Sequence, residues 1–251
     1  IFTAISFYSY GHFNKDKFYE TNNRVYEYKL RVIGSNIGLD RFYQKTDSIS
    51  VIKDLIILSD PNENEKIIFI WPEGIISNDI EDKLSQIKLL FERNFSENHL
   101  LISGVNKKFT NGKSEKYFNS LSVYNYKFEL IDTYNKINLV PFGEFLPFGD
   151  ILKKIGLKSL TNNYQSFSRG EKRKIIEIKK QNFSLKILPL ICYEIIYTGK
   201  LLNKSSYDLI INISEDGWFG HSIGPKQHFD HSIFRAIENG KYIIRSSNNG
   251  M

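Results

Sequence analysis

The chain contains a single cysteine, Cys192, and its thiol is the first candidate for chemistry. It follows an apolar run over residues 185–191, which predicts a buried strand that breaks into a turn. A thiol at a strand-to-helix turn can act as a nucleophile, because the turn exposes the sulfur and the N-terminus of the next helix lowers its pKa. The alternative is a buried structural cysteine, since free cysteine is among the most buried residue types.

Three charged residues elsewhere occupy similarly constrained positions. Glu73 comes after an apolar strand at residues 67–71, and Pro72 forbids the continuation of that strand. Ligands of open α/β sheets bind at the carboxyl ends of such strands. Lys136 and Glu144 lie in a segment with prolines and glycines among aromatic residues, which predicts a rigid, irregular loop. Each residue also has a structural alternative, as a helix cap or a solvated ion pair.

A carboxylate, an ammonium and a thiol together can transfer an acyl group. We expect Glu73 to take the proton of Cys192, so that the sulfur can attack an ester carbonyl. Lys136 and the backbone N–H of Tyr193 can then stabilise the oxyanion, while Glu144 holds the lysine charged and oriented. The product is a thioester, which an amine attacks readily.

The elements that must position these residues are predicted from periodicity. A chain of 251 residues with 41% hydrophobic residues is large enough for one α/β domain with a sizeable core. Short apolar runs alternate with amphipathic stretches, which is typical of a layered α/β domain. We expect strands at 29–34, 67–71, 100–105, 117–124, 126–131, 174–178, 183–191, 208–213 and 241–246, and helices at 46–59, 79–95, 195–203 and 226–239. Asn78 or Asp79 can cap the second helix, and a hairpin is predicted around Asn125.

Composition excludes several classes of function. The net charge is +6, but the lysines are scattered, which argues against a nucleic-acid surface and is compatible with anionic lipid headgroups. A single cysteine excludes an internal disulfide. We expect no metal site, because His221, His228 and His231 lack partners at a suitable spacing. Arg235 and Glu238, one helical turn apart, are expected to form a structural ion pair.

The first eleven residues are apolar and aromatic but too short to cross a bilayer, which needs about 20 residues. They also lack the basic region and cleavage site of a signal peptide. We interpret them as the end of a membrane helix with Tyr8 and Tyr10 at the interface. The alternative is a hydrophobic first strand.

Seven stretches, spread over about residues 30–251, resemble the carbon–nitrogen hydrolase (nitrilase) superfamily, and within it the branch of bacterial apolipoprotein N-acyltransferases. They are Trp71-Pro72-Glu73, Lys136 through Glu144, Ile191-Cys192-Tyr193-Glu194, Asp216 through Gly220, Gly224 through His228, Arg235 through Glu238, and Arg245 through Gly250. The chain departs from the family pattern at Glu215, where the family usually has Asn. It also begins at Ile1 and stops just after Gly250, where the family would continue.

The resemblance implies a four-layer α-β-β-α sandwich over residues 29–251, C-terminally truncated, preceded by a membrane-helix end and linker at 1–28. It implies catalysis by Glu73, Lys136 and Cys192, supported by Glu144, Tyr193 and Glu194. The aromatic residues that we expect to line an acyl-chain pocket are Phe142, Phe145, Phe148, Trp218 and Phe219. For any one of them, a place in the ordinary core is the alternative.

The reaction implied by this branch moves an sn-1 acyl chain from a phospholipid to the α-amino group of a diacylglyceryl-cysteine in an apolipoprotein. It requires no cofactor, and it places the domain on the periplasmic side of the bacterial inner membrane, as a monomer. One alternative is a soluble nitrilase-type amidase that passes the acyl group to water. Another is a non-catalytic fragment that does not act alone.

Overall fold

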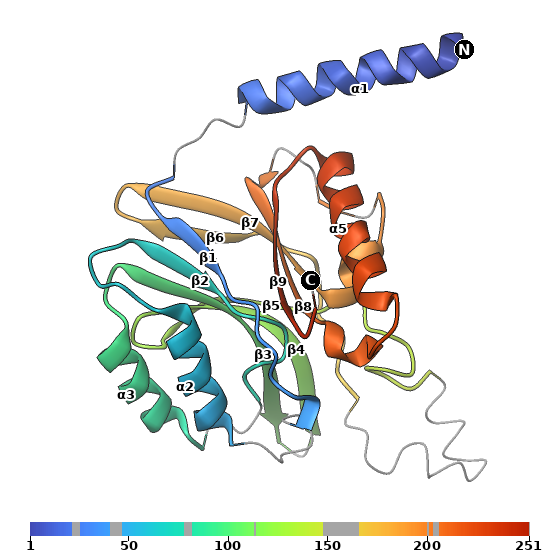
Figure 1. Cartoon of the computed structure of the whole chain (residues 1–251). Coiled ribbons are helices and arrows are strands. Elements are labelled where there is room, and N and C mark those ends of the chain that lie inside the picture. The colour runs from blue at the N-terminus through green and yellow to red at the C-terminus, as the bar shows by residue number, and fades with distance from the viewer. Residues whose placement is uncertain are drawn as a thin grey trace, which may run out of the picture.

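The computed structural model describes residues 1–21, 26–40, 47–77, 82–112, 114–147, 166–199, 201–202 and 206–250. Two sheets lie face to face in it (Figure 1). The first has the order β1 (Lys29–Val32), β2 (Ile67–Ile70), β3 (His99–Asn111), β4 (Ser114–Asn125) and β5 (Leu130–Asn135). The second has the order β6 (Ile176–Lys180), β7 (Phe183–Ile191), β8 (Leu209–Glu215) and β9 (Ile243–Asn248).

Helices cover the outer faces of both sheets. Helices α2 (Ser48–Ser59) and α3 (Leu84–Asn94) lie on the first sheet, and α5 (Gly224–Asn239) lies on the second (Figure 1). One buried apolar cluster fills the space between the sheets, a second lies under α2 and α3, and a third lies on the outer side of the second sheet. The fold is therefore the expected α-β-β-α sandwich.

Strand β2 illustrates why the sequence adopts this layering. Ile68 and Ile70 join the cluster between the sheets, whereas Ile67 and Phe69 join the cluster under the helices. Successive side chains of a strand point to opposite faces, so a strand buried on both faces needs an unbroken apolar run. Strand β2 is therefore buried on both faces.

Most expected elements are present, but the helix over 195–203 was predicted wrongly, and so were the bounds of two strands. Strand β3 continues to Asn111 instead of ending at 105. Instead of a helix over 195–203, a 3-10 helix, η4 (Cys192–Ile196), follows β7 and irregular backbone follows it. Strand β5 begins at Leu130 rather than at 126, because the Asn125 side chain accepts hydrogen bonds from the backbone N–H groups of Lys127 and Glu129 and so lengthens the turn. The proposed caps of the helix at 79–95 lie outside the described residues.

The N-terminal segment is helical rather than a strand, with α1 spanning Phe2–Thr21. None of the helices in the described ranges is both long enough and apolar enough to span a membrane. The interpretation of residues 1–28 as a membrane-helix end and linker stays a prediction.

Candidate active site

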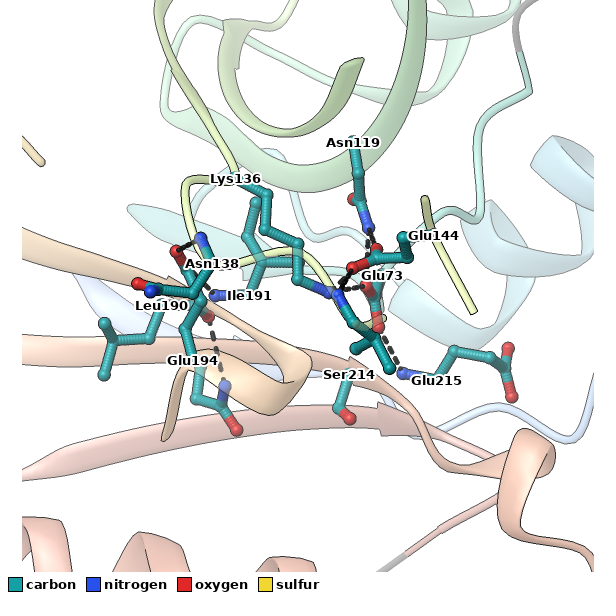
Figure 2. Close-up of polar contacts among 12 residues, drawn as sticks. Glu73, Asn119, Lys136, Asn138, Glu144, Leu190, Ile191, Glu194, Ser214 and Glu215 are labelled. Carbon is teal, nitrogen blue, oxygen red and sulfur yellow. Dashed lines mark hydrogen bonds and ion pairs between the residues drawn. The ribbon is translucent and has the colours of Figure 1, made fainter. Parts of the chain in front are cut away.

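The three candidate catalytic residues lie at the ends of three strands. Glu73 lies just beyond the end of β2, Cys192 directly follows β7, and Lys136 directly follows β5. Figure 2 shows Lys136 and Glu144 pointing toward Glu73. The side chains of Glu73, Lys136 and Glu144 therefore meet in one buried cluster.

Lys136 lies between the two carboxylates. Its Nζ donates to Glu144 Oε1 at 2.9 Å and to Glu73 Oε1 at 3.2 Å. The Lys136 side chain is only 1% exposed, and Glu73 is also buried. Although burial disfavours the ammonium, the charges of Glu73 and Glu144 raise the pKa of Lys136 well above 10.5. The lysine is therefore a permanent cation and hydrogen-bond donor at neutral pH, not a base.

Asn119 of β4 connects the two carboxylates from the other side. Its Nδ2 donates to Glu73 Oε1 at 2.7 Å and to Glu144 Oε1 at 2.8 Å (Figure 2). The second oxygen of Glu73 accepts from the backbone N–H of Glu215 at 2.9 Å, and that of Glu144 accepts from the backbone N–H of Val140 at 2.9 Å. These fixed donors hold both carboxylates in place.

Two glycines allow the backbone to approach this closely. A Cβ at Gly104 of β3 would lie 2.5 Å from the Cα of Glu73, so only glycine fits beside the Glu73 turn. A Cβ at Gly170 would lie 2.2 Å from the carbonyl oxygen of Asn135, and the Gly170 N–H donates to the Lys136 carbonyl at 2.8 Å. Both glycines thus position residues of the site through the backbone.

Cys192 occupies a strained turn. Its φ is +47°, in the left-handed region that non-glycine residues rarely adopt. The thiol is buried, and burial together with the charge of Glu73 raises its pKa to about 12, against the opposing effect of Lys136. The prediction that the following helix lowers this pKa was wrong, because only the short η4 follows and desolvation dominates. The resting residue is a thiol, so a base must take its proton.

Glu194 connects the turn at Cys192 to the loop that follows Lys136. Its Oε1 accepts from the backbone N–H of Ile137 at 3.0 Å and of Asn138 at 3.1 Å, and its Oε2 accepts from Ile191 N–H at 3.0 Å (Figure 2). The Tyr134 hydroxyl also donates to this carboxylate, at 2.7 Å. The fully buried Glu194 therefore fixes the segment after Lys136 relative to the segment before Cys192.

Arg173 pairs with the buried Glu194 carboxylate. The Arg173 guanidinium lies 3.5 Å from Glu194 Oε1, donates to Asn138 Oδ1 at 2.9 Å, and is only 10% exposed. A buried carboxylate needs such a partner. Tyr193, the other predicted supporting residue, is partly buried and makes an edge contact with Tyr197.

A cavity of about 90 Å³ opens at this site. Its lining includes Glu73, Asn119, Glu144, Phe167 and Trp218. Of the five aromatic residues predicted to line an acyl pocket, Trp218 is the one among the described residues that lines this cavity.

Phe142, Phe145 and Phe219 do not line this cavity. Phe142 is 72% exposed, because its left-handed φ of +60° belongs to a turn. Phe145 is partly buried in the same turn, and Phe219 packs its ring edge against His228. Phe148 lies outside the described residues. Arg235 and Glu238 form the expected ion pair on α5.

The sequence reasoning missed Asn119, Arg173 and Gly104. Asn119 is a polar residue within a strand, and its position became informative only once β4 was paired with β5. Gly104 carried a usable signal, since a glycine inside an apolar strand often marks a close backbone approach. Arg173 carried none, because charged residues surround it.

Comparison with known proteins identifies the family of the chain. The family described as carbon-nitrogen hydrolase matches residues 67–251. The chain is 32% identical over 232 residues to an apolipoprotein N-acyltransferase of Allorhizobium ampelinum, covering 88% of this chain and 43% of the relative. It is 34% identical over 190 residues to an apolipoprotein N-acyltransferase of Rhizobium leguminosarum bv. trifolii, covering 73% of this chain and 34% of the relative. The chain thus spans less than half the length of these curated relatives.

Solved structures share the fold at low identity. Nit3 of Saccharomyces cerevisiae, a member of branch 10 of the nitrilase superfamily, superposes with a TM-score of 0.51 and 16% identity, covering 87% of this chain and 74% of that one. An amidase from Nesterenkonia sp. superposes with a TM-score of 0.50 and 12% identity, covering 91% of this chain and 78% of that one. At such identity the likeness concerns the fold alone.

Proposed function

The chain belongs to the carbon–nitrogen hydrolase family, and we propose that it carries, over residues 29–251, the catalytic domain of an apolipoprotein N-acyltransferase. The observation that carries the chemistry is the buried lysine held between two carboxylates beside the chain's single thiol. The names of the relatives that cover most of the chain favour acyl transfer as the use of that chemistry.

In the first half-reaction, the Glu73 carboxylate takes the S–H proton of Cys192 and the sulfur attacks the sn-1 ester carbonyl of a phospholipid. The carbonyl oxygen becomes an oxyanion, which the ammonium of Lys136 and the backbone N–H of Tyr193 stabilise. Collapse breaks the ester C–O bond, and Glu73 returns the proton to the departing alkoxide. A lysophospholipid leaves, and the acyl chain remains as a thioester on Cys192.

In the second half-reaction, the α-amino group of a diacylglyceryl-cysteine attacks the thioester. Glu73 takes a proton from that amine, the C–S bond breaks, and the proton returns to the Cys192 thiolate. An amide forms on the apolipoprotein and the enzyme regains its starting state. Glu144 and Glu194 take no proton in this scheme, because they hold Lys136 and its loop in position.

The substrates set the proposed location. Because donor and acceptor are both lipids, we expect the domain to work at a membrane surface. We further propose that this surface is the periplasmic side of the bacterial inner membrane and that the domain is a monomer. Trp218 at the mouth of the cavity contributes to the acyl-chain site. No residue of the scheme calls for a cofactor.

A transfer assay tests the proposal. The full-length protein is incubated with a phospholipid labelled in its sn-1 chain and with a synthetic diacylglyceryl-cysteinyl peptide. We expect the label on the peptide amine, and none with a peptide whose amine is acetylated. Release of the label as free fatty acid, equal with and without peptide, would instead favour the amidase alternative.

A further inference from the structure

A second buried polar cluster lies behind Cys192, and the mechanism above does not use it. Its members are Ser214 and Asp216, at the junction of β8 and the 3-10 helix η6 (Asp216–Phe219), together with His228 of α5 and Arg245 of β9. Ser214 and Asp216 are fully buried, and His228 is 3% exposed. Each buried polar side chain needs a hydrogen-bond partner, so a cluster of four is costly to place in a core. Such a cluster is therefore a candidate for a functional role.

Asp216 is the centre of this cluster. Its Oδ1 accepts from Ser214 Oγ at 2.7 Å and from His228 Nδ1 at 2.9 Å, and its Oδ2 accepts from Arg245 Nη2 at 2.6 Å. Although burial opposes ionisation, the hydrogen bond from His228 and the charge of Arg245 lower the pKa of Asp216 to about 2. Asp216 is therefore a carboxylate at neutral pH.

His228 and Arg245 approach Asp216 from α5 and β9, whereas Ser214 approaches it from β8, the strand that pairs with β7. The negative charge of Asp216 is paired with the guanidinium of Arg245. Ser214 is the member of the cluster that follows the β7–β8 pairing next to Cys192, and what it offers the cysteine is a hydroxyl.

Strand register brings that hydroxyl to the nucleophile. Strands β7 and β8 are parallel, and Ile191 pairs with Ile213, so Cys192 and Ser214 follow at neighbouring positions. Although burial raises the pKa of the Cys192 thiol, hydrogen bonding with the nearby Ser214 side chain lowers it. Ser214 lies on β8 next to Glu215, below Glu73 in Figure 2.

We propose that Ser214 is a further catalytic residue, whose hydroxyl donates to the Cys192 sulfur when the thiolate forms, and that Asp216, His228 and Arg245 are positioning residues for this hydroxyl. In the resting thiol the Ser214 O–H points to Asp216. When the Cys192 proton leaves for Glu73, the O–H rotates to the sulfur, and no bond of the serine breaks. Asp216 still accepts hydrogen bonds from His228 and Arg245, so its negative charge remains paired.

The proposal rests on the proposed function only in taking Cys192 as the nucleophile, and its test needs no acyl donor. Alkylation of Cys192 by iodoacetamide is followed from pH 7 to 12 in the full-length protein, by mass spectrometry of the Cys192 peptide. In Ser214→Ala we expect the profile to shift upward by about one pH unit and the rate at pH 8 to fall about tenfold, since a hydrogen bond to a charged group is lost. Glu73, Lys136 and Glu144, the charged groups that act on this thiol, are unchanged in the variant.

Two controls separate this role from a structural one. Ser246→Ala removes another fully buried serine hydroxyl, on the neighbouring strand β9, and should leave the profile unchanged. Ser214→Thr keeps the hydroxyl and should restore the wild-type profile. If Ser214→Ala merely loosened the fold, the profile would move down toward that of free cysteine. A downward shift or no shift in Ser214→Ala therefore overturns the proposal, whether or not the protein transfers acyl chains.

Discussion

Nζ of Lys136 lies 3.2 Å from Oε1 of Glu73, although the two residues are 63 positions apart in the chain. Because both are buried, removing the cation leaves the Glu73 and Glu144 carboxylates facing each other without compensation. We expect Lys136→Met to lose activity and about 3–5 kcal/mol of unfolding free energy. Thermal unfolding followed by circular dichroism measures the loss. Lys127→Met, at an exposed turn, is the control, and equal melting of the two variants would contradict the argument.

Glu73→Gln keeps the shape of the side chain but cannot accept a proton. We expect acylation of Cys192 to slow by about 10²-fold or more, the usual contribution of a general base, while the fold is retained. Single-turnover acylation monitored by mass spectrometry provides the measurement. Glu92→Gln, exposed on α3, serves as the matched control. A Glu73→Gln protein that acylates at the wild-type rate would remove this residue from the mechanism.

We expect Glu194→Gln to disturb the loop that follows Lys136 rather than Cys192. The amide cannot accept all four donors that reach the carboxylate, and Arg173 loses its charge partner. We predict a loss of about 1–3 kcal/mol in stability and a fall in kcat greater than the change in KM. Steady-state kinetics at saturating lipid separates the two constants. A change confined to KM would show that Glu194 acts on substrate binding instead.

Gly104→Ala places a methyl group 2.5 Å from the backbone of Glu73. Overpacking costs about 1–3 kcal/mol, and here it also displaces the Glu73 turn. We expect activity to fall by more than stability alone explains, judged by specific activity at a temperature where the variant remains folded. Gly11→Ala in α1, where a Cβ meets nothing within 4 Å, should be neutral. Full activity in Gly104→Ala would show that the turn tolerates the shift.

We expect Asp216 to make the stability of the folded protein sensitive to acid. Its pKa is lowered from 3.8 to about 2 in the folded protein, so between these values the unfolded state binds more protons. The stabilisation, about 2 kcal/mol, is complete above about pH 5 and is lost as the pH falls toward 2. Melting temperatures from pH 6 to 3 should decline less steeply in Asp216→Asn than in the wild type. Parallel slopes for the two proteins would rule out this contribution.

Local signals in the sequence were enough to predict the strand ends next to Glu73 and Cys192, whereas the four-layer arrangement came from the family resemblance. An apolar run ending at Pro72 marks a strand end whatever surrounds it, and the same holds for the run before Cys192. The role of Asn119 depends on strand register, and that of Arg173 on a contact with Glu194 across 21 positions of chain. The exposure of Phe142 could not be predicted, because a local pattern does not reveal that its backbone turns outward with a positive φ.

The central claim is that Cys192 carries the acyl chain as a thioester, and intact-mass analysis of the full-length protein after incubation with phospholipid tests it most directly. We predict a mass increase of one fatty-acyl group, mapped to Cys192, absent in Cys192→Ala, and removed when a diacylglyceryl-cysteinyl peptide is added. A wild-type protein that shows no such adduct, or whose adduct survives the peptide unchanged, would contradict the account.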